Sequence, residues 1–463
     1  RGRELASQNQ VFRSYIGMGY SNTEVPPVIM RNVLENPAWY TSYTPYQAEI
    51  SQGRLESLLN YQTLVKSLTG LDISNASLLD EGTAAGEAMI LALNCVKDKK
   101  RNVFLVDENV LPQTLAVLQG RAMGFGIEVI TSKLHDNGKA TLPLEHKERI
   151  MGVLVQYPDV NGTLVDWAPL AKEVKELGGL LIAATDLLAL TMIKSPGEWG
   201  ADVAVGNAGR FGVPPGYGGP QSGFFAASDA IKRRMPGRLI GVSRDADGRP
   251  AYRLSLQTRE QHIRREKATS NICTAQALLA NMSAMYAVYH GPRGLRRIAA
   301  KVHALTIVLK KQLEQLGAKV VNRDGAFFDT LTIEAPASKV HKEATAKRIN
   351  LRRISDDHVG VTLDETVSVE DMTDVINSFA RAMSKPEIAA QDLVASTMEQ
   401  GLSAESLDSL SFDTNFARTS PYLTQPVFNS HHSETALLRY IHSLQNKDLS
   451  LIHISEPTRP ERI

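Results

Sequence analysis

The sequence predicts an α/β protein in which a mainly parallel sheet is covered by helices and followed by a smaller α+β unit. Between residues 75 and 225, short apolar runs alternate with helical patterns, as in parallel sheets whose strands are joined by crossover helices. After residue 318 the pattern shortens and mixes both types. The composition is that of an ordinary globular protein, with 43% hydrophobic and 22% charged residues. A chain of 463 residues has room for two to four domains.

The elements of the parallel sheet follow one another in a regular order. Strands are expected at residues 103–106, 127–130, 152–156, 180–184 and 201–205. Helices are expected at 111–123 and 169–177, each followed by a glycine suited to ending it, Gly124 and Gly178. Two further helices, at 274–289 and 295–316, follow the sheet, and the second ends before Gly317. Residues 1–317 are therefore predicted to form one large domain.

The remaining chain divides into three parts. Residues 318–391 are predicted to form the small α+β domain, with strands at 320–321, 327–333 and 359–363 and helices at 338–348 and from 368. Residues 392–448 are rich in Ser, Thr, Pro and Asn with a weak apolar period, which indicates a connecting arm that ends in a helix near 433–444. Residues 449–463 are considered below.

Charge and cysteine content exclude several classes of function. Lys plus Arg number 51 and Asp plus Glu number 50, so the net charge of +1 gives no general attraction to nucleic acid or to anionic membranes. The two cysteines, Cys95 and Cys273, form no metal-binding spacing, and a reducing compartment is expected. The most apolar stretch, 177–193, falls short of the ~20 apolar residues of a membrane span. We therefore predict no structural zinc, no nucleic-acid partner and no membrane segment.

A turn of small residues opens a helix at residues 78–89. Gly82 and Thr83 offer backbone N–H groups, a hydroxyl and little bulk, as a phosphate at a helix N-terminus requires. An ordinary tight helix start explains the same residues, and the segment alone does not decide between the two. Asp80 and Glu81 would oppose an anion unless they point away.

Asp186 follows the strand expected at 180–184, at a sheet edge where α/β proteins gather ligand groups. A carboxylate there can pair with the ring nitrogen of a pyridoxal cofactor, or it can cap the next helix. In a pyridoxal enzyme of this layout the Schiff-base lysine is expected near Gly209, after the next strand. Arg210 stands there instead, and no lysine occurs between Lys194 and Lys232.

Two polar segments are candidates for contact with other molecules. The first, residues 43–54, carries Tyr43, Tyr46, Gln47, Glu49 and Arg54, and either forms part of a pocket or is a solvated loop. The second, residues 259–267, gathers Arg, Lys and His around Ile263. Most such runs are solvated faces, but arginine beside an apolar residue is also typical of interfaces. The sequence contains no dinucleotide-binding motif, because the segment at Gly17 lacks the third glycine of that fingerprint.

Several long motifs resemble one known family, the glycine cleavage system P-proteins. The similarity extends from residue 1 to about 451, and the segments that carry it are 12–20, 43–62, 78–89, 211–220, 253–281 and 418–440. The resemblance implies a fold-type I pyridoxal-phosphate (PLP) transferase architecture in two homologous halves. This chain would be the first half with the arm leading to the second, and the PLP lysine, which binds the cofactor covalently, would lie in the missing half.

The resemblance also implies an activity and partners. The family decarboxylates glycine and transfers the aminomethyl group to the lipoyl arm of H-protein. The segment with Tyr43, Tyr46, Gln47, Glu49 and Arg54 would face the partner half's pocket, whereas Gly82, Thr83, Asp186, Gly209 and Arg210 would form a vestigial cofactor-like pocket. A homodimer or a heterotetramer is expected, in the mitochondrial matrix of a eukaryote or the cytoplasm of a bacterium. This chain alone is predicted to be inactive.

The chain departs from the family pattern at two places, and one alternative remains. Gln221 stands where the family usually has histidine, so a proton-carrying role at that position is in doubt. Residues 449–463 match a translated sequencing adapter better than the family's continuation, so this tail is expected to be non-native. The alternative function is a non-catalytic half that only docks the catalytic half and H-protein.

Overall fold

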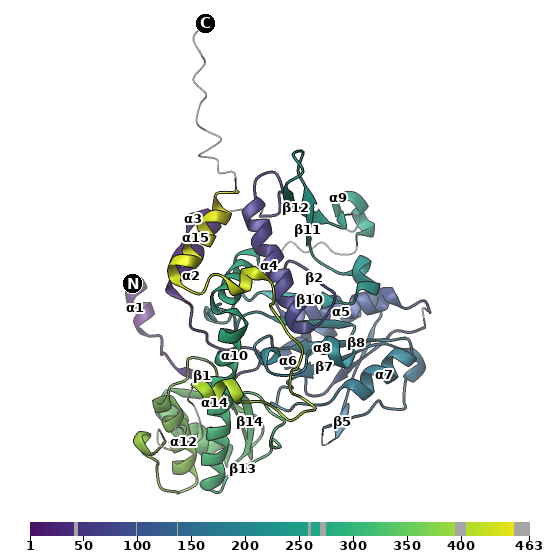
Figure 1. The fold of residues 1–463 in the computed structure, drawn as a ribbon. Coiled ribbons are helices and arrows are strands. Elements are labelled where there is room, and N and C mark those ends of the chain that lie inside the picture. The colour runs from purple at the N-terminus through teal and green to yellow at the C-terminus, as the bar shows by residue number, and fades with distance from the viewer. Residues whose placement is uncertain are drawn as a thin grey trace.

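The computed structural model describes residues 1–463 apart from 41–44, 99, 137, 258–260, 269–274, 394–403 and 449–463. The described chain contains a large sheet and a smaller sheet, each packed against helices. The smaller unit, with α12 and β13, lies at one end of the molecule in Figure 1, and the C-terminal helix α15 lies at the other.

The large sheet has seven strands, and its parallel core was predicted. The order is β2 (Ile73–Ser74), β10 (Gly223–Ala227), β9 (Val203–Asn207), β8 (Leu180–Thr185), β7 (Ile150–Tyr157), β3 (Val103–Asp107) and β4 (Glu128–Ser132). The last five are mutually parallel, and each matches an expected strand to within a few residues. The antiparallel edge formed by β10 and β2 was not expected.

Helices cover both faces of this sheet, so its central strands are apolar on both sides. All of β7 is buried. Phe104 and Val106 pack in one core with α5 (Glu81–Cys95) and α6 (Pro112–Ala122). The alternate residues Val103 and Leu105 pack on the other face with α4 (Gln52–Thr69), α7 (Ala168–Glu176) and α10 (Ala277–Gln315).

Helix α10 connects the two units. The sequence predicted two helices here, and the structure joins them at a kink where Gly291 has φ 63° and ψ 179°, followed by Pro292. Met282, before the kink, lies in the core of the large unit, whereas Leu305 and Leu309, after it, lie in the core of the smaller one. The second half of α10 therefore belongs structurally to the small domain.

The smaller sheet includes a strand from the start of the chain. Its order is β1 (Arg13–Tyr15), β15 (Ile349–Arg353), β16 (His358–Thr362), β14 (Thr330–Glu334) and β13 (Lys319–Val320), with helices α11 (Ala337–Ala346) and α12 (Val369–Ala382). Neither β1 nor β15 was predicted, and the two pair in parallel. Strand β1 therefore belongs to the smaller sheet and not to the large domain predicted for residues 1–317. The sequence did not reveal this, because pairing between distant segments leaves no local pattern.

The segment predicted as an arm packs mainly on the large unit where it is described, although its Leu393 lies in the core of the smaller unit. It contains α14 (Ala404–Ser409), the 3₁₀ turn η8 (Pro426–Asn429) and α15 (Glu434–Gln445). The last of these confirms the helix expected near 433–444, and Ser433 caps it. Helix α15 lies against α4 so closely that a Cβ on Gly53 would be 1.8 Å from the Leu444 carbonyl oxygen. Arg418 donates to the carbonyl oxygens of Ser67 and Leu68 at the end of α4.

The other elements border these units. Apart from short 3₁₀ turns, they are α1 (Gly2–Ser7), α2 (Pro27–Ile29), the π-helical turn η1 (Met30–Leu34), α3 (Pro37–Tyr40), β5 (His135–Asp136), β6 (Lys139–Ala140), α8 (Pro196–Trp199), the hairpin β11 (Leu239–Arg244) with β12 (Pro250–Ser255), and α9 (Gln261–Arg264). The hairpin projects from the body at the top of Figure 1 beside α9. Among the described helices, none is long and apolar enough to cross a membrane.

Candidate functional site

The carboxyl ends of β7, β8 and β9 meet at one edge of the large sheet, and a cavity of about 80 Å³ lies there. Gln156, Asp186 and Asn207 line it from these strand ends, and Asp329 lines it from the start of β14 in the smaller unit. Of the residues predicted for a cofactor-like pocket, Asp186 and Arg210 line this cavity. In the described chain, no group of His, Cys, Asp and Glu side chains has a metal-binding arrangement.

A glycine-rich segment from the N-terminal region lines the same cavity. Gly17, Met18 and Gly19 have φ values of 68°, 59° and 86°, a run that two glycines make possible. Gln113 Nε2 donates to the Met18 carbonyl oxygen at 2.7 Å, and Asn207 Nδ2 donates to the Gly19 carbonyl oxygen at 3.3 Å. The segment that failed as a dinucleotide motif thus forms one wall of the cavity.

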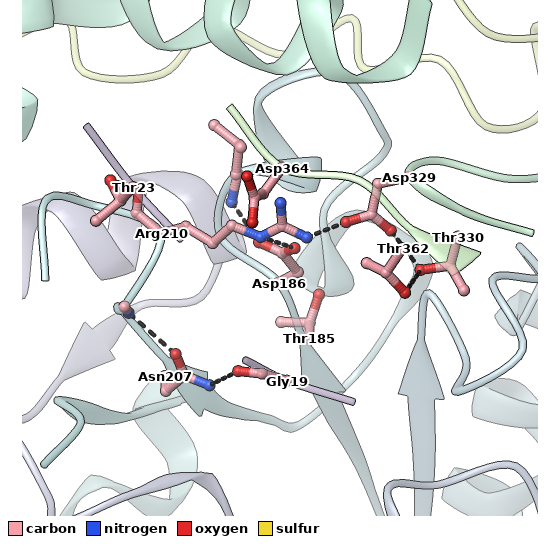
Figure 2. Close-up of polar contacts among 12 residues, drawn as sticks. Gly19, Thr23, Thr185, Asp186, Asn207, Arg210, Asp329, Thr330, Thr362 and Asp364 are labelled. Atoms are coloured by element: carbon pink, nitrogen blue, oxygen red, sulfur yellow. Dashed lines mark hydrogen bonds and ion pairs between the residues drawn. The ribbon is translucent and has the colours of Figure 1, made fainter. Parts of the chain in front are cut away.

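Arg210 is held between two carboxylates, one from each unit. Its Nε lies 2.9 Å from Asp186 Oδ2, and its Nη2 contacts Asp329 Oδ2 (Figure 2). The side chains of Arg210 and Asp329 are 11% and 7% exposed. Burial alone would lower the pKa of Arg210, but Asp186 and Asp329 raise it above its ordinary value. The guanidinium is therefore a permanent cation that joins the loop after β9 to β14, and we call these three residues the Arg210 clamp.

Further hydrogen bonds fix the acidic side of this clamp. Thr330 Oγ1 donates to Asp329 Oδ1 at 2.8 Å and lies 2.9 Å from Thr362 Oγ1. Asp364, which also adds to the negative potential at Arg210, accepts from the Asn22 backbone N–H at 2.8 Å. Each carboxylate near the guanidinium thus has an ordered hydrogen-bond donor.

The helix start that was a candidate phosphate cradle is already capped by a carboxylate. Asp80 accepts from the Thr83 backbone N–H at 2.7 Å, so the ordinary helix start is the interpretation that the structure favours. Gly82 lines a neighbouring cavity together with Glu81. Burial, together with Asp186 and Asp80, raises the pKa of Glu81 to about 8, although the Gln156 amide opposes the rise.

Asp186 caps the following turn, which is one of the two alternatives that the sequence left open, and its second oxygen binds Arg210. Its Oδ1 accepts from the Leu188 backbone N–H at 2.8 Å, which caps the following turn, and its Oδ2 binds Arg210. Gly209 donates its backbone N–H to Asn207 Oδ1 at 3.0 Å. Of the five residues predicted for the vestigial pocket, Asp186 and Arg210 contact each other, while Gly82 and Thr83 lie at the start of α5.

The predicted substrate-facing segment contains both buried and exposed side chains. Tyr43 lies outside the described residues. Tyr46 is largely buried beneath Arg238, whose guanidinium carbon is 4.4 Å from the ring centroid, and burial raises the pKa of Tyr46. Gln47 and Glu49 are exposed. Only Gln47 and Glu49 of the described members are therefore free to reach another molecule.

Arg54 has a structural partner that the sequence did not reveal. Its Nη1 lies 2.6 Å from Asp448 Oδ2, and its Nη2 contacts the Ala38 carbonyl oxygen. Asp448 also accepts from the Gly53 backbone N–H at 2.8 Å. Arg54 thus fastens the start of α4 to the end of the described chain, and this contact occupies the guanidinium predicted for a pocket.

The basic run at residues 259–267 is described only in part, because residues 258–260 are not. Ile263 is 49% exposed, and Arg264 and Arg265 are exposed beside it. The side chains that motivated an interface prediction are therefore at the surface. Whether they meet a partner stays a prediction.

Sequence reasoning missed Asp329 and Gln156. Asp329 lies 119 residues from Arg210, and its only local signal is a carboxylate directly after the buried pair Phe327 and Phe328. Gln156 is a buried polar residue near the end of β7, where parallel strands place ligand groups. Strand-end position could have identified Gln156, but no local pattern pairs Asp329 with Arg210.

The family model for the glycine cleavage system P-protein matches residues 2–379 of this chain. The chain belongs to this family. It is 56% identical over 457 residues to a mitochondrial glycine dehydrogenase (decarboxylating) of Schizosaccharomyces pombe, and 55% identical over 451 residues to a glycine dehydrogenase (decarboxylating) of Paraburkholderia xenovorans. These matches cover 98% and 97% of this chain but 44% of each relative. The chain thus spans less than half the length of these relatives.

Solved structures confirm the predicted PLP-transferase-like fold. A glycine decarboxylase P-protein in inhibitor-bound form superimposes with a TM-score of 0.75 at 34% identity, over 82% of this chain and 87% of that one. A NifS-like protein matches with a TM-score of 0.56 at 13% identity, over 81% of this chain, and an aspartate aminotransferase of Thermus thermophilus with 0.51 at 15%. The last two likenesses concern the fold alone.

The residues at this cavity do not fit PLP. The position expected for the lysine holds Arg210, whose contacts with Asp186 and Asp329 cross the cavity region. Asp80 occupies the Thr83 N–H that a phosphate would need, and Glu81 adds a second carboxyl. The cavity of about 80 Å³ is also smaller than the ~150 Å³ space that holds a benzene ring. No catalytic step is therefore assigned to PLP in this chain.

Proposed function

We propose that this chain forms the lysine-free half of a glycine dehydrogenase (decarboxylating) and acts together with a second half that binds PLP. Family membership and the names of both relatives support the reaction, and the 44% coverage supports a missing second half. The substrates are then glycine and the lipoyl group of H-protein. PLP would be held by the second half and would supply electron-sink chemistry there.

The Arg210 clamp is the observation that carries this proposal. A guanidinium stays protonated at neutral pH and is a poor nucleophile, so Arg210 cannot form a Schiff base with an aldehyde. Its contacts with Asp186 and Asp329 instead tie the two units of this half together. This half therefore offers a fixed surface to its partner, and covalent chemistry on PLP takes place elsewhere.

Gln47 and Glu49 are the residues that we propose reach the partner half's pocket. Both are exposed, whereas Tyr46 is packed beneath Arg238 and Arg54 is paired with Asp448. We therefore assign Tyr46 and Arg54 to positioning the segment, and Gln47 and Glu49 to contact with substrate or lipoyl sulfur.

The second candidate function is a scaffold half that docks the catalytic half and H-protein without touching substrate. The self-contained Arg210 clamp favours it. In the assembled enzyme, Glu49→Ala should lower turnover without changing the amount of complex recovered by gel filtration. Glu145→Ala, at another exposed glutamate, is the matched control. Unchanged turnover in Glu49→Ala and in Gln47→Ala would favour the scaffold.

Complementation tests the proposed function directly. The chain is expressed alone and together with the remaining C-terminal part of the Schizosaccharomyces pombe relative, and glycine-dependent CO₂ exchange is measured with lipoylated H-protein. We expect no exchange from the chain alone and exchange from the assembled pair. Exchange by the chain alone, or a stable assembled pair that binds PLP but never exchanges CO₂, would refute the proposal.

Assembly and location follow from the same proposal. The segment after α14 leads toward the second half, and the complete enzyme is a homodimer of long chains or a heterotetramer of two subunits. In a eukaryote it is mitochondrial, as the name of the fission yeast relative says of that protein, and in a bacterium it is cytoplasmic.

A further inference from the structure

We propose that the cavity beside the Arg210 clamp binds a small primary ammonium ion, which the side-chain oxygens of Glu81 and Gln156 hold by accepting its N–H groups. This site goes beyond the proposed function, because neither decarboxylation nor aminomethyl transfer requires it of this half. The inference rests on two unpartnered acceptors, the charge of the cavity and its size.

Glu81 and Gln156 are buried, the Gln156 amide hydrogen-bonds Glu81, and one oxygen of each side chain is left without a partner among the described residues. Glu81 is 7% exposed and Gln156 is 6% exposed, and both line the cavity. Glu81 Oε1 and Gln156 Oε1 have no hydrogen-bond partner in the described chain. Leaving a buried oxygen unpaired costs about 1–3 kcal/mol, so two adjacent ones favour a ligand that donates hydrogen bonds.

The charge of the lining favours a cation. Glu81, Asp159, Asp186 and Asp329 contribute four carboxyl groups, and Arg210 contributes one guanidinium. The single guanidinium of Arg210 faces the carboxylates of Asp159, Asp186 and Asp329, and Glu81 becomes a fourth carboxylate when it ionises on binding. His135, 3.7 Å from Asp159, offsets part of this charge when it is protonated. An anion would have to approach against this negative potential.

The kind of cation follows from the acceptors and the space. One amide oxygen and one carboxyl oxygen suit the N–H donors of an ammonium group, and the absence of a metal-binding group in the described chain argues against a divalent ion. A cavity of about 80 Å³ admits an ammonium with one or two carbon atoms. Asp186 and Asp329 occupy Arg210 Nε and Nη2, and a ligand carboxylate that reached Nη1, which has no hydrogen-bond partner in the described chain, would be repelled by both of these carboxylates.

Binding is coupled to release of a proton. Because burial raises the pKa of Glu81 to about 8, this group is mostly protonated at pH 7 when the cavity holds no cation. An ammonium stabilises the ionised form, so Glu81 gives up its proton on binding. The other charged groups that face it are Asp80 on its own helix, Asp186, Asp159 with His135 at 3.7 Å, and the pair Arg210 and Asp329. Each of these carboxylates attracts the bound cation.

Calorimetry with methylammonium chloride tests the site. The full chain is titrated at pH 7 in phosphate and in HEPES, at an ionic strength held constant with tetramethylammonium chloride. We expect saturable binding, with heats in the two buffers that differ by the release of up to one proton. Glu81→Gln and Gln156→Met should each weaken binding by about tenfold or more, because each removes an acceptor of a charged donor. Glu87→Gln, at another glutamate of α5 outside the cavity lining, should bind as the unchanged protein does.

Two further ligands distinguish an ammonium site from a general cation site and from a site for amino acids. Potassium chloride, which has the charge but no N–H donor, and glycine, which adds a carboxylate, should both bind more weakly than methylammonium. Thermal unfolding confirms that each variant is folded. If Glu81→Gln does not fold, the affinity of Gln156→Met decides the test. Absence of methylammonium binding, equal binding of potassium, tighter binding of glycine, or unchanged affinity in a folded Glu81→Gln or Gln156→Met would overturn the proposal.

Discussion

Replacement of Arg210 by methionine should destabilise the chain by about 3–5 kcal/mol at pH 7. The substitution roughly conserves the length of the side chain but removes the cation that faces Asp186 and Asp329. Asp329 is then left as an unpaired charge in a site where its side chain is 7% exposed, while Asp186, at 23%, keeps part of its hydration. Breaking a buried ion pair from one side costs about this much because the remaining charge is uncompensated.

The loss should depend on pH in a definite direction. Burial raises the pKa of Asp329, and the variant loses the Arg210 charge that opposes this rise, so the folded-state pKa of Asp329 lies further above its unfolded value near 3.9. A carboxyl with a raised folded-state pKa destabilises the protein at high pH, and the penalty disappears as pH falls and the group protonates in the folded state. The difference in stability between Arg210→Met and the unchanged chain should therefore shrink as the pH falls from 7 toward 5.

Urea unfolding followed by tryptophan fluorescence gives the comparison as a shift in midpoint. The double variant Arg210→Met with Asp329→Asn should recover part of the loss, because the unpaired charge is removed together with its partner. A coupling energy of about 1–3 kcal/mol is expected from the cycle of single and double variants. A loss below about 1 kcal/mol, or one that does not change with pH, would refute the view that Arg210 is a buried clamp.

Three further predictions concern other parts of the chain. Gly53→Ala should destabilise the chain and detach α15 from α4, because the new Cβ would overlap a backbone carbonyl. Gly120→Ala, with open space around it, should instead stabilise α6 by about 0.5–1 kcal/mol. Urea unfolding of the two variants measures both changes in stability. Burial lowers the pKa of His303 to about 4, so the stability that the neutral imidazole contributes above pH 6.5 should fall by up to about 3 kcal/mol as the pH falls to 4. In thermal unfolding, His303→Gln should make the melting temperature less dependent on pH over this range. An unchanged pH dependence would contradict the prediction. Charge reversal at Arg264 and Arg265 should weaken association with the second half or H-protein, and unchanged binding at low salt would refute that contact.

Local patterns predicted the central elements of the fold but not the long-range pairs. The buried strands β3, β7 and β8 were predictable because both faces of a parallel sheet are apolar, and the helix near 433–444 was indicated by its weak apolar period. Strand β1 has three residues and pairs with β15 (Ile349–Arg353), which is distant in the sequence, so no local period distinguishes it. The kink at Gly291 joined two helices whose separate patterns were both visible.

The sequence indicated where Asp186 and Arg210 lie in the fold but not which side chains they contact. Asp186 and Arg210 were identified from the strand ends, and the structure brings them into contact. Their partner Asp329 comes from the smaller unit, so its part in the site depends on how the two units pack. Arg54 looked like a pocket residue because its ion pair with Asp448 joins the beginning of α4 to residues far along the chain. Tertiary contacts of this kind are not encoded in any short segment.

Borohydride reduction followed by peptide mapping tests the central claim most directly. The assembled enzyme is reduced in the presence of PLP, and the pyridoxyl group is located by mass spectrometry. The account predicts a label on the second half and none on any lysine of this chain, because Arg210 occupies the position after β9 and is held by Asp186 and Asp329. A pyridoxyl group fixed to one lysine of this chain, together with glycine-dependent CO₂ release by the chain alone, would contradict it.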